Sequence, residues 1–115
     1  MNEDVKGVDI SEVKIGPVVY EVQYKEGLRG HDDLLLDGNI VYSDCLINIA
    51  SGQHPQHQLV VLWHEILHGI LTAAGIELDN NEQVVTALAH GVMGVVVDNP
   101  QLMGLMGYQR QEEQG

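Results

Sequence analysis

His64, Glu65 and His68 are the residues whose types and spacing could do chemistry. On a helix, two histidines four positions apart lie about 40° apart around the axis and one turn along it, so both imidazoles can reach one metal ion. Glu65 would lie close enough to reach a water at that metal without binding the metal itself. The pattern is that of an HExxH zinc hydrolase site, with two neutral imidazole ligands and a carboxylate as general base.

The alternative is that these three side chains are polar residues satisfied within a core. A bare HExxH match arises by chance in roughly one in a hundred chains of this size. The residues around it, from Leu59 to Leu71, are almost all apolar, which predicts a helix buried nearly all round. Ionisable groups on such a helix are costly unless something satisfies them, and this favours a metal.

The composition indicates one folded domain, residues 1–115, with a flexible arm over 1–12 and a flexible tail over 107–115. Apolar residues make up 44% of the chain, and Phe is absent, so aliphatic side chains must build the core. The net charge of −12 argues against a nucleic-acid partner or an anionic membrane surface. A basic polypeptide partner is compatible with this charge.

Two further observations predict a cytoplasmic protein. The first residues, 1–6, are polar and acidic, unlike a secretion signal, and the apolar run over 84–97 is too short to span a bilayer. Cys45 is the only cysteine, which suits a reducing compartment. We expect it to be a small buried apolar residue rather than a nucleophile.

The elements that must position the motif are a small sheet and two helices. Alternating residues predict a strand from Val18 to Lys25, and two strand-like runs follow the Asp37-Gly38 turn signal, over 39–42 and 46–49. Residues 27–33, which include His31, read as a loop. The predicted fold is therefore α+β, with a small antiparallel or mixed sheet packed on a buried HExxH helix.

The HExxH helix should begin at Pro55, run to about Ala74 and stop at Gly75. A second helix should open within residues 79–82 and be ended by Asp98-Asn99-Pro100. Its apolar residues recur at helical spacing and should face the core. A short helical turn is expected over 102–106.

A catalytic zinc takes three protein ligands, and the residues after His68 supply no nearby histidine. A carboxylate on the second helix is the expected third ligand, and Glu82 in its first turn is the first choice. Asp79-x-x-Glu82 also matches a capping box, so the residues alone leave both roles for Glu82 equally open. Glu77, Asp79 and His90 are weaker alternatives.

The HExxH stretch, the Gly75-Ile76 pair, the Asp79-Asn-Asn-Glu82 segment and the apolar helix ending Asp98-Asn-Pro100 together resemble minimal gluzincin metallopeptidases. The small ImmA/IrrE-like or phage-encoded zinc peptidase domains are the most similar set, over residues 38–102. The resemblance implies a zinc site of HExxH plus glutamate, peptide-bond hydrolysis in the (host) cytoplasm, and Glu82 as the third ligand.

The chain departs from the thermolysin type at two points. One turn after the ligand glutamate, where an acidic residue would orient a ligand histidine, it has Thr86, whose hydroxyl adds no negative charge. No motif assigns the donors that stabilise the tetrahedral intermediate. Their candidates are tyrosines and histidines outside the motif: Tyr42, His54, His57 and Tyr108.

The sequence thus predicts a zinc metallopeptidase in which Zn²⁺ is held by His64, His68 and Glu82, and Glu65 is the general base. Its partner would be a protein or peptide substrate, and its oligomeric state is left open. The alternative is a non-catalytic zinc-binding or peptide-interaction domain that retains the gluzincin fold.

Overall fold

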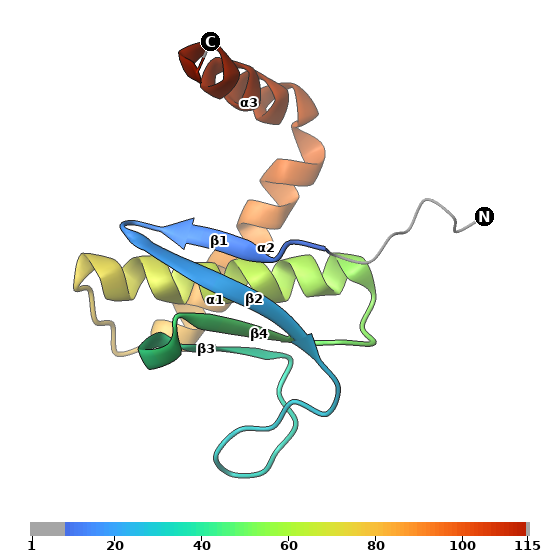
Figure 1. Ribbon diagram of the computed structural model, residues 1–115, viewed down its shortest axis with the longest axis vertical. Coiled ribbons are helices and arrows are strands. Elements are labelled where there is room, and N and C mark those ends of the chain that lie inside the picture. The colour runs from blue at the N-terminus through green and yellow to red at the C-terminus, as the bar shows by residue number, and fades with distance from the viewer. Residues whose placement is uncertain (1–8, 115) are drawn as a thin grey trace.

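The structure, a computed structural model, describes the backbone of residues 9–114 and the side chains of residues 9–107. The elements, in order, are β1 (Glu12–Ile15), β2 (Val18–Lys25), β3 (Gly38–Val41), the 3-10 helix η1 (Tyr42–Asp44), β4 (Leu46–Ala50), α1 (Pro55–Ala74), α2 (Asn81–Asp98) and α3 (Pro100–Gln114). The α+β prediction is confirmed (Figure 1). Of the predicted arm, residues 1–8 lie outside the described part of the chain.

The four strands form one mixed sheet in the order β1-β2-β4-β3. β2 and β4 are parallel and align Val22 with Ile47, whereas β1 and β3 pair antiparallel on the outside. β1 was not predicted, because its four residues lie beside the polar N-terminus. Gly16, with φ of 58°, makes the turn that joins β1 to β2. β1 and β3 are therefore the edge strands.

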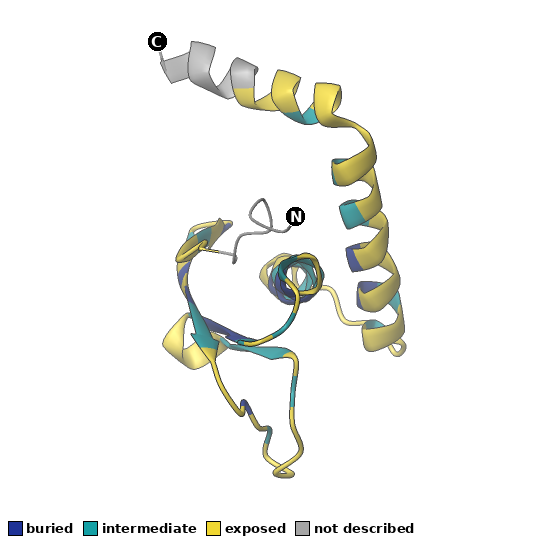
Figure 2. Cartoon of the chain, turned by 90° about the vertical axis from the view of Figure 1, so that its right-hand side faces the viewer, coloured by how far each residue is buried: buried dark blue, intermediate teal, exposed yellow. Residues whose placement is uncertain are grey.

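The core lies between the sheet and α1. Ile47 and Ile49 of β4 are fully buried, and Val61 and Leu62 of α1 pack against them. Figure 2 shows α1 end-on, with the sheet on one side and α2 on the other. The HExxH helix is therefore the middle layer, and its position is set by contacts on two sides.

α1 has the bounds that its end signals predicted. Pro55 occupies its first turn, and the His54 ring accepts a hydrogen bond from the Gln56 backbone N–H at 3.1 Å. At the other end Gly75 adopts φ of 71°, and the N–H groups of Gly75 and Ile76 donate to carbonyls of the last turn. The prediction that α1 is buried nearly all round was wrong, since Ile70 is 44% exposed.

α2 also ends at Asp98 as predicted, but its burial differs from the prediction. Of its apolar face only Val85 and Ala89 are buried, and Leu88 and Val95 are about half exposed. The reason is that α1 packs on one side of α2 (Figure 2), whereas Leu88 and Val95 line an open apolar groove bordered by Met103 and Met106 of α3. Within the described part of the chain, no helix has the length and apolar character needed to cross a bilayer.

Two local predictions were corrected. α3 extends from Pro100 to Gln114, far beyond the single turn expected, and only its backbone is described past residue 107. Cys45 is exposed rather than buried. It ends η1 in the left-handed conformation, with φ of 50°.

Candidate metal centre

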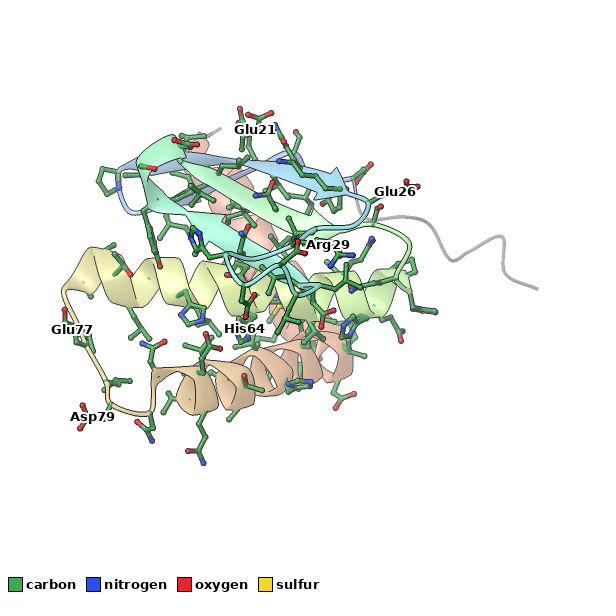
Figure 3. The ribbon with its side chains drawn as sticks, turned by 90° about the horizontal axis from the view of Figure 1, so that it is seen from below. Glu21, Glu26, Arg29, His64, Glu77 and Asp79 are labelled. Atoms are coloured by element: carbon green, nitrogen blue, oxygen red, sulfur yellow. The ribbon has the colours of Figure 1, made fainter. Side chains whose placement is uncertain are left out.

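α1 presents His64 and His68 from the same side, one turn apart. Their Nε2 atoms lie 3.2 Å from each other, and their side chains are only 22% and 16% exposed. His64 lies between α1 and α2 (Figure 3). The two rings therefore form a mostly buried pair whose nitrogens converge on one point.

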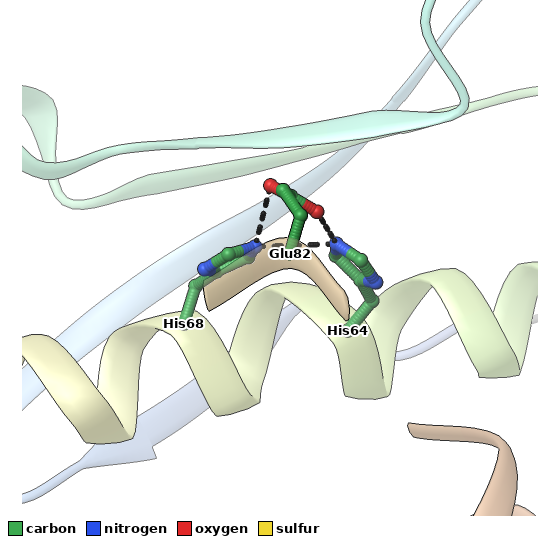
Figure 4. A group of neighbouring side chains, drawn as sticks. All are labelled: His64, His68 and Glu82. Carbon is green, nitrogen blue, oxygen red and sulfur yellow. Dashed lines mark hydrogen bonds and ion pairs between the residues drawn. The ribbon is translucent and has the colours of Figure 1, made fainter. Parts of the chain in front are cut away.

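Glu82 of α2 completes the group (Figure 4). Its Oε1 lies 3.0 Å from Nε2 of His64, and its Oε2 lies 3.0 Å from Nε2 of His68. The capping-box alternative for Glu82 is wrong, because α2 is capped at Asn80 and no side-chain hydrogen bond closes that cap. Glu82 is thus free to point at the histidines.

The spacing of these atoms fits a small tetrahedral cation. In a zinc site with bonds of about 2.0–2.1 Å, two ligand atoms lie about 3.3 Å apart. Here the two Nε2 atoms lie 3.2 Å apart, and each lies 3.0 Å from a different carboxylate oxygen of Glu82. Without a metal, each Nε2–H could instead donate a hydrogen bond to its own carboxylate oxygen of Glu82, so the same geometry also satisfies the metal-free group.

Glu65, the residue between the ligand candidates, points to the sheet side of α1. It is buried, at 6% exposure. Burial, followed by the nearby charge of Glu82, raises the pKa of Glu65 from 4.5 to about 7. A carboxyl with such a pKa can take up and release a proton near neutral pH.

Gly38, the first residue of β3, lets the sheet approach Glu65. A Cβ built on Gly38 would lie 2.5 Å from Cγ1 of Val61, 2.9 Å from the Asn48 carbonyl oxygen and 3.5 Å from a carboxylate oxygen of Glu65. Only glycine fits this position without displacement. The sequence indicated Asp37-Gly38 as a turn, and the close packing of Gly38 was not foreseen.

Tyr42 is the candidate donor that the structure brings to the centre. It lines an open groove together with His68, Glu82 and residues of β3. The Thr72 hydroxyl, one turn after His68 on α1, donates to the Tyr42 hydroxyl oxygen at 3.0 Å. Since that oxygen accepts from Thr72, the phenolic hydrogen is left to donate elsewhere.

A second pocket, of about 250 Å³, adjoins the centre on its other side and shares His64 and Glu65 with it. Four further polar residues line this side pocket: Asp37, His57, Thr86 and His90. The Thr86 hydroxyl does not orient a ligand ring, because among the described side chains no hydrogen bond joins it to His64 or His68. Its backbone carbonyl instead lies 3.0 Å from Nδ1 of His90.

The remaining candidates lie elsewhere. Glu77 and Asp79 are exposed on the loop between α1 and α2 (Figure 3), outside the group formed by the histidines and Glu82. His54 is used as the N-terminal cap of α1, and His31 lies exposed in the 27–33 loop. The side chain of Tyr108 lies outside the described residues.

Asp37 and Thr72 were missed at the sequence level. Their signal was weak, because each reaches the site through a contact between distant segments: Thr72 with Tyr42, and Asp37 with the ring of His57, at 3.5 Å.

Comparison of the chain with protein-family models, with curated proteins and with solved structures finds no match.

Proposed function

We propose that the protein is a zinc-dependent peptidase that hydrolyses a peptide bond of a protein substrate in the cytoplasm. The observation that carries the proposal is the convergence of His64, His68 and Glu82 beside a buried glutamate. Two imidazoles and one carboxylate are a donor set of catalytic zinc sites, which keep one position open. Bound there, Zn²⁺ supplies a Lewis acid that activates water and polarises a carbonyl.

Glu65 is the proton carrier of the proposed reaction. Its carboxylate would accept a proton from the attacking water and deliver it to the nitrogen of the leaving amine, a contribution of about 10²–10⁴-fold. A raised pKa, near 7, suits both transfers. Burial also keeps Glu65 from exchanging that proton freely with solvent.

β3 supports the proposal as a place for the substrate backbone. It is an edge strand, paired only with β4, and its residues Asn39 and Ile40 line the groove that contains the metal-ligand candidates. An extended peptide could pair with such an edge through main-chain hydrogen bonds. Tyr42, at the end of β3, would then donate its hydroxyl hydrogen to the oxygen of the scissile carbonyl.

The test is zinc-dependent cleavage of a peptide library by the wild-type protein and by Glu65→Gln. The variant should bind one zinc per chain, as the wild type does, and cleave at least about 10²-fold more slowly. Glu77→Gln, which removes an exposed carboxylate on the α1–α2 loop, is the matched control and should cleave normally. Equal cleavage by wild type and Glu65→Gln would remove Glu65 from the mechanism.

A specific observation favours a second candidate, a non-catalytic zinc-binding domain. Among the described side chains, no hydrogen bond reaches the Nδ1 atoms of His64 or His68. In catalytic sites an acidic partner typically binds this atom and fixes the orientation of the ring. Zinc would then mainly join α1 to α2. Zinc binding without cleavage of any peptide in the library would support this candidate over the peptidase.

A further inference from the structure

We infer that the side pocket binds a lysine or arginine side chain of the substrate, next to the bond that is cut. The inference rests on the proposed peptidase function. It begins from the position of the pocket, which shares His64 and Glu65 with the candidate metal centre. A residue bound there would be adjacent to the reacting carbonyl.

The size of the pocket matches one side chain. At about 250 Å³, it is smaller than the roughly 300–1,000 Å³ of sites for whole drug-sized molecules. Val60 and Val61 of α1 give it an apolar wall. Lysine and arginine have an aliphatic stem that can pack against such a wall and a charged end that seeks polar partners.

The polar groups of the pocket accept hydrogen bonds or carry negative charge. The Asp37 carboxylate lies at its edge, held by the side-chain amide of Gln53 at 2.9 Å. Nδ1 of His90 lies 3.0 Å from the Thr86 carbonyl, which can only accept, so the hydrogen of a neutral His90 ring is on Nδ1. Nε2 of His90 is then an acceptor.

The charged residues of the pocket argue against a preference for acidic substrate side chains. Among the described side chains no lysine or arginine lines the pocket, and the charged residue that lines it outside the candidate metal centre, Asp37, is acidic. The ring of His57 lies 3.5 Å from the Asp37 carboxylate. The net charge of −12 adds long-range attraction for cations.

The experiment uses pools of short peptides of varied neutral sequence that differ at one fixed residue: Lys, Arg, norleucine or Glu. Norleucine keeps the apolar stem and lacks the charge. At pH 8 with zinc, the Lys and Arg pools should be cut at least about tenfold faster than the norleucine pool. Mass spectrometry should find the cut at one constant position relative to the basic residue.

Asp37→Asn should reduce the ratio of Lys-pool to norleucine-pool cleavage by about fivefold or more while zinc content stays the same. The matched control is Asp98→Asn, which removes the same charge from the exposed end of α2. It should leave the ratio unchanged. An unchanged ratio in Asp37→Asn, or an equal fall in Asp98→Asn, would overturn the assignment of the pocket.

A binding measurement separates this inference from the proposed function. The affinity of zinc-loaded Glu65→Gln for labelled Lys and norleucine peptides should differ by about fivefold or more. That preference without cleavage by the wild type would support the pocket and overturn the peptidase. Cleavage without preference for basic residues would overturn the pocket alone, and neither binding preference nor cleavage would overturn both.

Discussion

At the scale of single residues, Glu65 is an ionisable side chain that the fold removes almost completely from water, at 6% exposure. Burial is the first cause of its raised pKa, and the charge of Glu82 is the second. The folded metal-free protein therefore holds a proton on Glu65 up to about pH 7, whereas the unfolded chain releases it near 4.5. Because the folded state binds more protons between these values, its stability falls as the pH rises through that window.

We expect metal-free Glu65→Gln to be more stable than metal-free wild type at pH 8 and nearly equal to it at pH 4.5. By the conversion of about 1.4 kcal/mol per pKa unit, the difference could reach about 3 kcal/mol. Urea unfolding in the presence of a chelator measures it. Glu26→Gln, an exposed control, should change stability little at either pH. A difference in the free energy of unfolding between Glu65→Gln and wild type that is the same at pH 4.5 and at pH 8 would contradict this account.

A second prediction at this scale concerns Tyr42. If its hydroxyl donates to the developing oxyanion, Tyr42→Phe should lower kcat about 10²-fold with a small change in KM and unchanged zinc content. Thr72→Val removes the hydroxyl that contacts Tyr42 and should lower kcat less, because Tyr42 keeps its own hydrogen. A larger loss in Thr72→Val than in Tyr42→Phe would contradict the assignment.

At the scale of elements, the approach of β3 to α1 depends on Gly38. Gly38→Ala should lower the free energy of unfolding by about 1–3 kcal/mol, because its Cβ would press on Val61 and on a backbone carbonyl. Gly91→Ala is the control, since nothing lies within 4 Å of its Cβ position in α2. It should stabilise the helix by about 0.5–1 kcal/mol. Denaturant unfolding of both variants checks the contrast.

The elements also show which parts of the structure could be predicted from sequence. The ends of α1 were predictable because Pro55 and Gly75 act through the local backbone. The sequence left the role of Glu82 open, because the Asp79-x-x-Glu82 pattern is compatible both with a capping box and with a metal ligand. Only the relative position of α1 and α2 decides between these two roles. The side pocket and Gly38 depend on contacts between distant segments, so local patterns could not reveal them.

At the scale of the whole molecule, the candidate centre joins α1, which packs on the sheet, to α2, which packs on α1. α2 buries only Val85 and Ala89, and the radius of gyration, 15.2 Å, exceeds the about 13 Å expected for a compact domain of this length. α3 leads away from the sheet (Figure 1). A cation between Glu82 and the histidines would therefore fix α2 as well as serve chemistry.

We expect zinc to raise the melting temperature and to protect the loop over residues 75–80 from proteolysis. At a zinc concentration 100 times Kd, binding should raise the free energy of unfolding by about 2.7 kcal/mol. Glu82→Ala should lose most of this gain, and Glu77→Ala should keep it. Thermal unfolding and limited proteolysis, each with zinc and with chelator, provide the measurements. Equal zinc protection in both variants would exclude Glu82 as a ligand.

The uneven distribution of charge has a consequence for how the molecules behave in solution. Residues 83–97 contain no Asp, Glu, Lys or Arg, and several of their apolar side chains are exposed. In dilute buffer the net charge of −12 makes copies of the protein repel one another. In 1 M salt, where the Debye length is only about 3 Å, this repulsion is screened, whereas the exposed apolar surface of α2 is unchanged. High salt should therefore promote association of the protein through the exposed apolar surface of α2. Light scattering should rise with ionic strength.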